Sequence, residues 1–339
     1  MEILKRIKSA IRILLRGEEN QSTRNDIPPL TAEQVAEVKG FFPMEKFFIY
    51  GHARSGTTLL ARLIRLHPEV HCNWQAHFFT RQPLLNSLVN NAEMEEWLTR
   101  RSNRWNNGGD LSPLVMRAAA DYIMESDAKR AGAEKHIVGD KSPNSLNDGE
   151  SVRLMHAVYP DAYLINIVRD GRDVLISQRF RNFVEESKFM TAEDKKIVDA
   201  LRRNQTPFTN GERSIFTEKW LRANAEGWVK NLTETANEGR HLLGEHYYEL
   251  RYEDLLATPF AEMKKVWALF GINVDDELGE AIQAEMTSNP DQTWQKERNE
   301  SIADFLPKGK AGNWQNILTV RDREIFNEVA GEMLKKWYY

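Results

Sequence analysis

Residues 47–64 have the sequence FFIYGHARSGTTLLARLI. A short apolar run ends at Gly51, and apolar residues recur with helical spacing after Gly56. A strand, a glycine-containing turn and a helix are the setting of a phosphate-binding loop, whose backbone amides and helix N-terminus attract anions. The triphosphate-binding form of this loop has lysine directly after its second glycine, where this chain has Thr57. The stretch therefore predicts an α/β fold and an anion site whose cation is Arg54.

The side chains of this loop add to its capacity to hold an anion. Hydroxyl donors are available from Ser55, Thr57 and Thr58. The guanidinium of Arg54 can pair with two oxygens of a phosphate or sulfate at once. The alternative is a tight strand–helix turn that binds nothing, but a single glycine would suffice for such a turn.

Composition restricts the kind of partner. The chain has 339 residues, with 46 Lys and Arg against 50 Asp and Glu, for a net charge of −4. This balance argues against nucleic-acid binding over the whole surface, so a basic site must be local. The single cysteine, Cys72, excludes an internal disulfide framework and favours a reducing, cytoplasmic location. No window of 18 apolar residues is present, so no membrane span is expected.

The first residues have a separate pattern. In residues 3–16 apolar side chains fall on one helical stripe and five cations occupy the rest. We expect residues 1–39 to form a basic amphipathic helix and a polar linker, and residues 40–339 to form one domain. The helix can dock on its own domain or on a partner subunit, or can lie on an anionic membrane surface. The oligomeric state cannot be inferred from this pattern.

The rest of the chain alternates strands with helices. Strands are expected at residues 162–168 and 247–251, a helical stretch at 83–129, and a helix at 216–238. The polar segment 181–212 is expected to be an irregular insertion or lid. Such alternation predicts a central parallel sheet flanked by helices on both faces.

A second anion site is predicted in the segment IVRDGRDVLIS. Magnesium-binding nucleotide enzymes place an aspartate at the end of such an apolar strand, whereas this strand ends in Arg169. Ser177 follows eight residues later, one to two turns into the next helix, so the two side chains can converge on one phosphate. Taken alone, the segment can equally be an exposed turn with ordinary ion pairs.

Two lysine-bearing segments complete the basic set. Lys141 follows an apolar run in GDKSP, and ligands of α/β sheets gather beyond the carboxyl ends of the strands. The loop FLPKGKAGNW, residues 305–314, carries Lys308, Gly309 and Lys310 and can clamp a phosphate. Solvated surface lysines are the alternative for this loop.

Together these four segments resemble the sulfotransferases that use 3′-phosphoadenosine-5′-phosphosulfate (PAPS). The stretches RSGTTLLARLIRLHPEVHC, DKSP and VRDGR are most similar to those of tyrosylprotein and related bacterial sulfotransferases. The resemblance covers residues 46–314 and implies a fold like that of the P-loop nucleoside triphosphatases, with PAPS as the cofactor and no required metal. It implies these cofactor contacts: Arg54, Ser55, Gly56, Thr57 and Thr58 at the 5′-phosphosulfate; Arg169, Ser177, Lys308, Gly309 and Lys310 at the 3′-phosphate; and Tyr252 at the adenine.

The resemblance also suggests the catalytic groups. Charge builds on the departing phosphate during sulfuryl transfer, and Arg54 and Lys141 are the candidates to stabilise it. In the similar proteins a glutamate follows the HPEV segment as general base, and here the matching residue is Gln75. An extended strand would put His77 on the same face, so His77 is the predicted base. The alternative is a buried histidine with both ring nitrogens satisfied.

Three functions are consistent with these residues. The leading one is a PAPS-dependent sulfotransferase acting on a hydroxyl of a glycan, lipid, phenol or peptide. A P-loop kinase is disfavoured by Thr57 and Arg169, because a lysine and an aspartate are usual at those positions. A non-catalytic nucleotide-binding relative is suggested by Gln75, since an amide cannot accept the proton.

Overall fold

The computed structural model describes residues 27–80, 84–102, 104, 106, 108–144, 149–184, 190–288, 310–337 and 339. The predicted helix within residues 3–16 and the pair Lys308 and Gly309 lie outside the described residues. In chain order the elements are α2 (Ala32–Phe41), β1 (Glu45–Tyr50), α3 (Thr57–Ile64), β2 (Val70–Trp74), α4 (Leu84–Val89), α5 (Ala92–Thr99), α6 (Ser112–Ala131), β3 (Ile137–Lys141), α7 (Glu150–Val158), β4 (Tyr163–Val168), α8 (Gly171–Val184), α9 (Ala192–Arg203), α10 (Thr206–Thr209), α11 (Glu218–Leu243), η1 (Gly244–His246), β5 (Tyr247–Arg251), α12 (Tyr252–Ala257), α13 (Pro259–Leu269), α14 (Glu277–Thr287), α16 (Trp314–Ile317) and α17 (Val320–Lys336).

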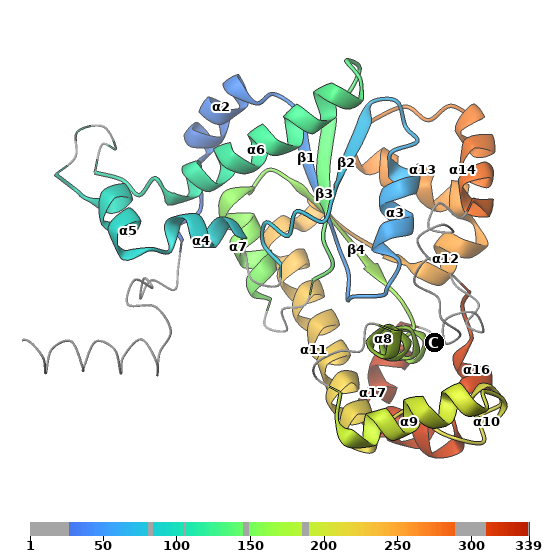
Figure 1. Cartoon of the computed structure of the whole chain (residues 1–339). Helices are drawn as coiled ribbons and strands as arrows, with labels where there is room; N and C mark the ends of the chain where they lie inside the picture. Colours follow the sequence, from blue (N-terminus) through green and yellow to red (C-terminus); the bar gives the residue numbers. More distant parts are fainter. Residues whose placement is uncertain are drawn as a thin grey trace, which may run out of the picture.

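The five strands form one sheet in the order β2-β3-β1-β4-β5, and every neighbouring pair is parallel. The predicted parallel sheet is confirmed (Figure 1). After β1 the chain forms β2 and β3 on one side of it, and then β4 and β5 on the other side. Ligands bind beyond the carboxyl ends of strands at such a switch point. The loop after β1 therefore stands at the position in the sheet where a ligand is expected.

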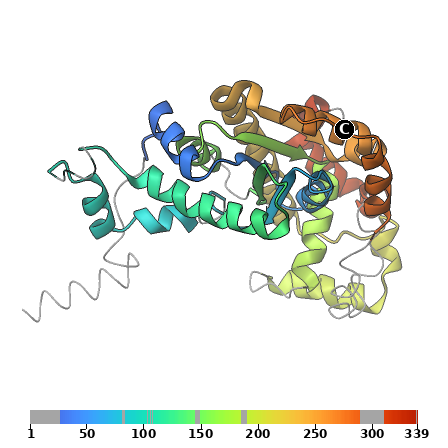
Figure 2. The ribbon, with the colours of Figure 1, turned by 90° about the horizontal axis from the view of Figure 1, so that it is seen from above.

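Alternate residues of β1 face two separate hydrophobic cores. Phe47 and Ile49 pack with the apolar faces of α3 and α13, whereas Phe48 and Tyr50 pack with α6 and α7. The views from the front and from above show α6 running lengthwise past the sheet (Figures 1 and 2). Burial of both faces explains why residues 47–50 of β1 form a continuous apolar run rather than an alternating one.

A third core lies beyond the carboxyl ends of the strands. It joins α8, α9, α11 and α17, with Trp228 and Phe326 at ring-centroid distance 5.9 Å (Figure 1). This core supports helix α8, and of the two residues of the predicted second anion site Arg169 precedes α8 and Ser177 lies in its second turn. The fold thus places both basic motifs at one end of the sheet.

One sequence expectation about helices is confirmed and refined, and one is corrected. The stretch 83–129 is helical, but it is divided into three helices, because Asn91 caps α5 with its side chain and a turn with Gly108 and Gly109 separates α5 from α6. The segment 181–212 is largely helical, since α8 continues to Val184 and Thr191 starts α9 with a capping box. Local capping, which a reading by polarity overlooks, decides both cases.

The chain packs against the domain before residue 40. The Leu30 amide donates to the Ala157 carbonyl at 2.8 Å, and Val38 of α2 is buried. The sequence placed this segment in a linker, whereas α2 contacts α6. Among the described residues, no helix combines the length and apolar composition needed to cross a bilayer.

Candidate active site

The loop between β1 and α3 is shaped by two residues in the left-handed backbone region. Gly56 has φ 97° and caps α3, and Arg54 has φ 76°. Glycine is required at Gly56 because a Cβ there would stand 2.3 Å from the ring of Tyr252. Arg54 has a Cβ and carries this conformation at a cost of about 1 kcal/mol, a kind of strain that concentrates at functional sites. The turn directs the loop amides and the N-terminus of α3 toward the end of the sheet.

Tyr252 packs against this loop at Gly56. Its side chain is only 3% exposed, and the guanidinium of Arg169 lies over the ring, 4.6 Å from the centroid. The predicted contact between Tyr252 and adenine stays a prediction. The Tyr252 ring lies between the loop after β1 and the Arg169 guanidinium and contacts both.

Arg169 joins three segments that are distant in sequence. Its Nη1 donates to the Arg54 carbonyl at 3.1 Å and its Nη2 to the Lys310 carbonyl at 3.0 Å. The Arg54 side chain in turn donates from Nε to Ser177 Oγ at 3.0 Å. Four residues predicted to bind the cofactor, Arg54, Arg169, Ser177 and Lys310, are therefore connected by hydrogen bonds. Lys310 takes part through its carbonyl, and its side chain is exposed.

Lys141 reaches the same loop from the neighbouring strand. It ends β3, is 2% exposed, and donates from Nζ to Thr58 Oγ1 at 3.3 Å. The ammonium also lies 4.7 Å from the centre of the Trp74 ring, which is half exposed at the end of β2. A cation that is shielded from water and adjacent to the phosphate loop is suited to stabilise charge on a transferred group.

Two acidic residues that the sequence analysis did not single out hold the second motif in place. Asp173 accepts from the amides of Gly312 and Trp314 at 2.6 and 3.0 Å, which joins α8 to the segment before α16. Burial raises the pKa of Asp173 although Arg169 is near. Glu253 accepts the Asp170 amide at 3.1 Å. Asp173 follows Arg169 by four residues and lies 4.0 Å from its guanidinium, and this spacing was the available signal for its role.

The sequence matches one family over most of its length. Residues 46–276 match the family described as "Sulfotransferase family". The chain belongs to the sulfotransferase family. Arg54, Lys141 and Arg169 lie within the matched residues, whereas Lys310 lies beyond them.

Curated relatives agree with this membership. Protein-tyrosine sulfotransferase A of Caenorhabditis elegans is 30% identical over 236 residues, which are 68% of this chain and 51% of the relative. A protein-tyrosine sulfotransferase of Drosophila melanogaster is 30% identical over 129 residues, 38% of this chain and 24% of the relative. The chain thus spans about half the length of the first of these relatives.

Among solved structures, mouse sulfotransferase SULT7A1 complexed with PAP aligns with 90% of this chain and 90% of its own, at 17% identity and a TM-score of 0.46. Retinol dehydratase in a complex with retinol and PAP covers 91% of this chain and 96% of its own, at 17% identity and a TM-score of 0.47.

The loop after β2 of this sulfotransferase differs from the expected extended strand. β2 ends at Trp74, and Gln75 and His77 have φ values of 50° and 52°. The expectation that the two side chains share one face of a strand is wrong, because sheet pairing ends at Lys141 and the chain turns there. His77 is half-buried, and its Nδ1 lies 2.7 Å from Thr80 Oγ1. Its role as a base stays a prediction.

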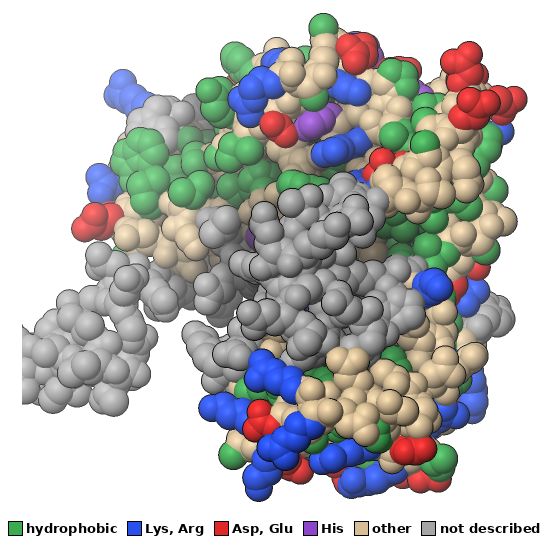
Figure 3. Space-filling model, turned by 45° about the vertical axis from the view of Figure 1, so that its right-hand side comes forward, with side chains coloured by type: hydrophobic (Ala, Val, Ile, Leu, Met, Phe, Trp, Pro, Cys, Tyr) green, Lys and Arg blue, Asp and Glu red, His purple; other side chains and the backbone are tan. Residues whose placement is uncertain are grey.

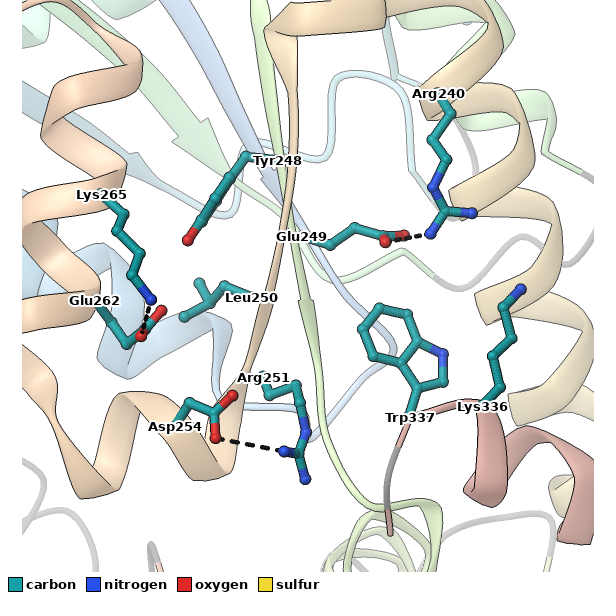
Figure 4. Close-up of a pocket in the computed structure, with 10 residues that line it drawn as sticks. All are labelled: Arg240, Tyr248, Glu249, Leu250, Arg251, Asp254, Glu262, Lys265, Lys336 and Trp337. Carbon is teal, nitrogen blue, oxygen red and sulfur yellow. Dashed lines mark hydrogen bonds and ion pairs between the residues drawn. The ribbon is translucent and has the colours of Figure 1, made fainter.

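Two further surface features lie outside this constellation. A hollow of about 360 Å³ lies beside β5, lined by three ion pairs, Lys336 and Trp337 (Figure 4). Among the described residues, none of the predicted cofactor contacts lines it. Separately, Lys and Arg side chains gather at the lower end of the face in Figure 3. Helix α9, which lies at the lower end of the molecule in Figure 1, exposes Lys195, Lys196, Arg202 and Arg203.

Proposed function

We propose that the protein transfers a sulfuryl group from PAPS to a hydroxyl acceptor. The proposal rests on family membership and on one observation, the hydrogen-bonded joining of the loop after β1 to the start of α8 through Arg54, Ser177 and Arg169. A donor with anionic groups at both ends of a ribose needs two adjacent basic sites. The relatives named protein-tyrosine sulfotransferases and the neighbours solved with PAP support this choice of donor.

Orphaned polar atoms support the fit of a phosphate-bearing ligand. Ser55 Oγ and Arg169 Nε are buried and have no hydrogen-bond partner among the described residues. A buried donor without a partner costs about 1–3 kcal/mol, so such atoms are commonly satisfied by a ligand or water. Both atoms belong to the motifs predicted to hold the donor. PAPS supplies the activated sulfuryl group, and the chain supplies binding, orientation and charge.

Some residues of the chain act on the sulfuryl donor, and others act on the acceptor. On the donor side, the amides at Gly56 and the Ser55 hydroxyl hold phosphate oxygens, and Arg54 offsets their charge. Lys141 stands where β3 ends and stabilises the charge that develops on the bridging oxygen. On the acceptor side, the loop from Gln75 orients the hydroxyl, and His77 receives its proton.

A direct transfer experiment tests this proposal. The purified chain is incubated with radiolabelled PAPS and a panel of phenols, glycans, lipids and tyrosine peptides, and with ATP and Mg²⁺ in parallel. Transfer of label that persists with EDTA is expected. Phosphoryl transfer that EDTA abolishes would support a kinase instead. Tight binding of PAP in calorimetry without transfer to any acceptor would support the non-catalytic relative, which Gln75 suggests.

A further inference from the structure

The loop Gln75–Thr80 is strained and stands beside the proposed reaction centre. Its first amide, on Gln75, donates to the Lys141 carbonyl at 2.9 Å, so the loop leaves the sheet at Lys141. Gln75 and His77 both have left-handed φ values, 50° and 52°. A residue with a Cβ pays roughly 1–2 kcal/mol for this conformation, and it persists only where surrounding contacts enforce it.

Two residues that flank Lys141 supply those contacts. Asp140 Oδ1 accepts the Ala76 amide at 2.9 Å, and Asp140 Oδ2 accepts the Ser142 hydroxyl. Ser142 Oγ in turn accepts the His77 amide at 2.9 Å. Two successive amides of the strained turn are therefore held by hydrogen bonds. The Ala76 amide donates to a carboxylate of β3, and the His77 amide donates to the hydroxyl of the residue after β3.

The far end of the loop is fixed by packing. Phe78 and Phe79 are buried, and the Phe79 ring meets Phe48 of β1 edge-on at 5.5 Å. The strained turn thus lies between two anchors, the Lys141 carbonyl at one end and the aromatic core at the other. Gln75 is exposed, next to the half-exposed Trp74. The turn therefore presents its side chains at the open end of the sheet.

Burial of the Asp140 carboxylate disfavours the folded state, so stability alone does not account for this residue. Its side chain is 1% exposed at the end of a central strand, and burial raises its pKa to about 6. Lys141 is near enough to lower that pKa somewhat, but burial outweighs it. Within the part of the chain that the structure describes, no cation forms a close ion pair with Asp140. A buried carboxylate of this kind points to a functional requirement at that position.

We propose that Asp140 is a positioning residue: acting through Ala76 and Ser142, it fixes the strained Gln75–His77 turn beside Lys141 and so sets the pose of the acceptor. This inference rests on the proposed function for its kinetic consequence. Its structural part, the anchoring of the turn, stands apart from any activity. The role depends on the geometry of the carboxylate as an acceptor of hydrogen bonds rather than on proton transfer by Asp140.

Two substitutions separate geometry from charge. Asp140→Ala removes the acceptor of both hydrogen bonds, whereas Asp140→Asn keeps an oxygen for the Ala76 amide and removes the charge. In Asp140→Ala, we expect hydrogen exchange of the Ala76 and His77 amides to accelerate at least tenfold. Turnover is expected to fall at least tenfold, measured with PAP and p-nitrophenyl sulfate as the probe donor. In Asp140→Asn both quantities should return to within threefold of the wild type.

Binding of PAP provides the specificity control. Its Kd is expected to stay within twofold in both variants, because Asp140 touches the acceptor loop and not the phosphate loop. Asp127→Ala, which removes a carboxylate of α6 that pairs with His71 on β2, should change neither exchange of the turn nor turnover. If Asp140→Ala does not fold, Ser142→Ala replaces it, and the His77 amide should exchange faster.

The outcomes that overturn the inference are distinct from failure of the proposed function. Wild-type exchange at both amides in Asp140→Ala would refute the anchoring. Turnover in Asp140→Asn as low as in Asp140→Ala would assign proton chemistry to Asp140 and refute a purely positioning role. Absence of sulfuryl transfer in the wild type would count against the proposed function alone, while hydrogen exchange would still decide the anchoring.

Discussion

Arg54 Nε and Ser177 Oγ are joined by a 3.0 Å hydrogen bond, although 123 residues separate them in the chain. The bond links the loop after β1 to helix α8 after β4, and these two strands are neighbours in the sheet. The two anion sites predicted from the sequence are therefore adjacent. A ligand with two anionic groups would contact both partners of this bond.

Replacement of Ser177 by alanine tests whether the two adjacent sites bind one ligand. We expect Ser177→Ala to weaken PAP binding about tenfold, because a hydrogen bond to a charged group contributes about 1.5–3 kcal/mol. Isothermal titration calorimetry with PAP measures the change. Ser126→Ala on α6 is the control and should bind as the wild type does. Unchanged affinity in Ser177→Ala would remove Ser177 from the donor site.

Arg169 is expected to tolerate no conservative replacement. A lysine cannot bond the carbonyls of Arg54 and Lys310 together while lying over the Tyr252 ring. In Arg169→Lys we expect the free energy of unfolding to fall by about 1–3 kcal/mol and the Kd for PAP to rise at least tenfold. Urea unfolding and calorimetry measure the two effects. The exposed Arg321→Lys serves as the control, and a wild-type Kd in Arg169→Lys would contradict the assignment.

Tyr339 supports the turn at Arg169 and Asp170 through Glu253. Its hydroxyl donates to Glu253 Oε2 at 2.6 Å, and the other oxygen of Glu253 accepts the Asp170 amide. We expect Tyr339→Phe to lower the free energy of unfolding by about 1–2 kcal/mol, since one oxygen of Glu253 is left unpaired. PAP affinity should fall about threefold. Tyr122→Phe, at a tyrosine 66% exposed, is the matched control. Equal effects of the two substitutions would show that Tyr339 gives the turn no special support.

The raised pKa of Asp140 gives a stability prediction with a definite sign. The pKa is about 6 in the folded chain and 3.8 in the absence of the fold, so the ionised carboxylate disfavours folding above pH 6. This penalty, up to about 3 kcal/mol for a shift of this size, disappears as the pH falls from 6 toward 4. The other titratable groups around Asp140 are Lys141, Tyr50 and Cys72.

Asp140→Asn should therefore be more stable than the wild type at pH 7.5, with a difference that shrinks toward pH 4.5. Urea unfolding of both chains at the two pH values measures the difference. A variant that is less stable than the wild type by the same amount at both pH values would show that the carboxylate does not carry this penalty. A gain in stability combined with intact turnover would agree with a role through geometry.

The sequence by itself determined the parallel strands and the loops after them that carry the basic residues. Apolar runs followed by glycines, and cations at the ends of those runs, predict strands and the loops after them, because these signals are local in the chain. The parallel sheet was confirmed, and the order of strands placed Arg54, Lys141 and Arg169 at one end. The helix within 181–212 was missed, and the breaks within the helical stretch 83–129 were not predicted, because single capping residues, such as Thr191 and Asn91, decide where a helix begins.

Only the tertiary structure decided how the side chains are used. Tyr252 is buried against Gly56 and Arg169, and the turn at Gln75 and His77 is held by Asp140 and Ser142. These contacts join residues more than 60 positions apart in the chain. Spacing along a sequence reports the faces of one strand or helix, whereas strain and burial arise only when separate elements meet. The loop after β1 is thus determined by local sequence, whereas the turn at Gln75 and His77 depends on contacts between separate elements of the fold.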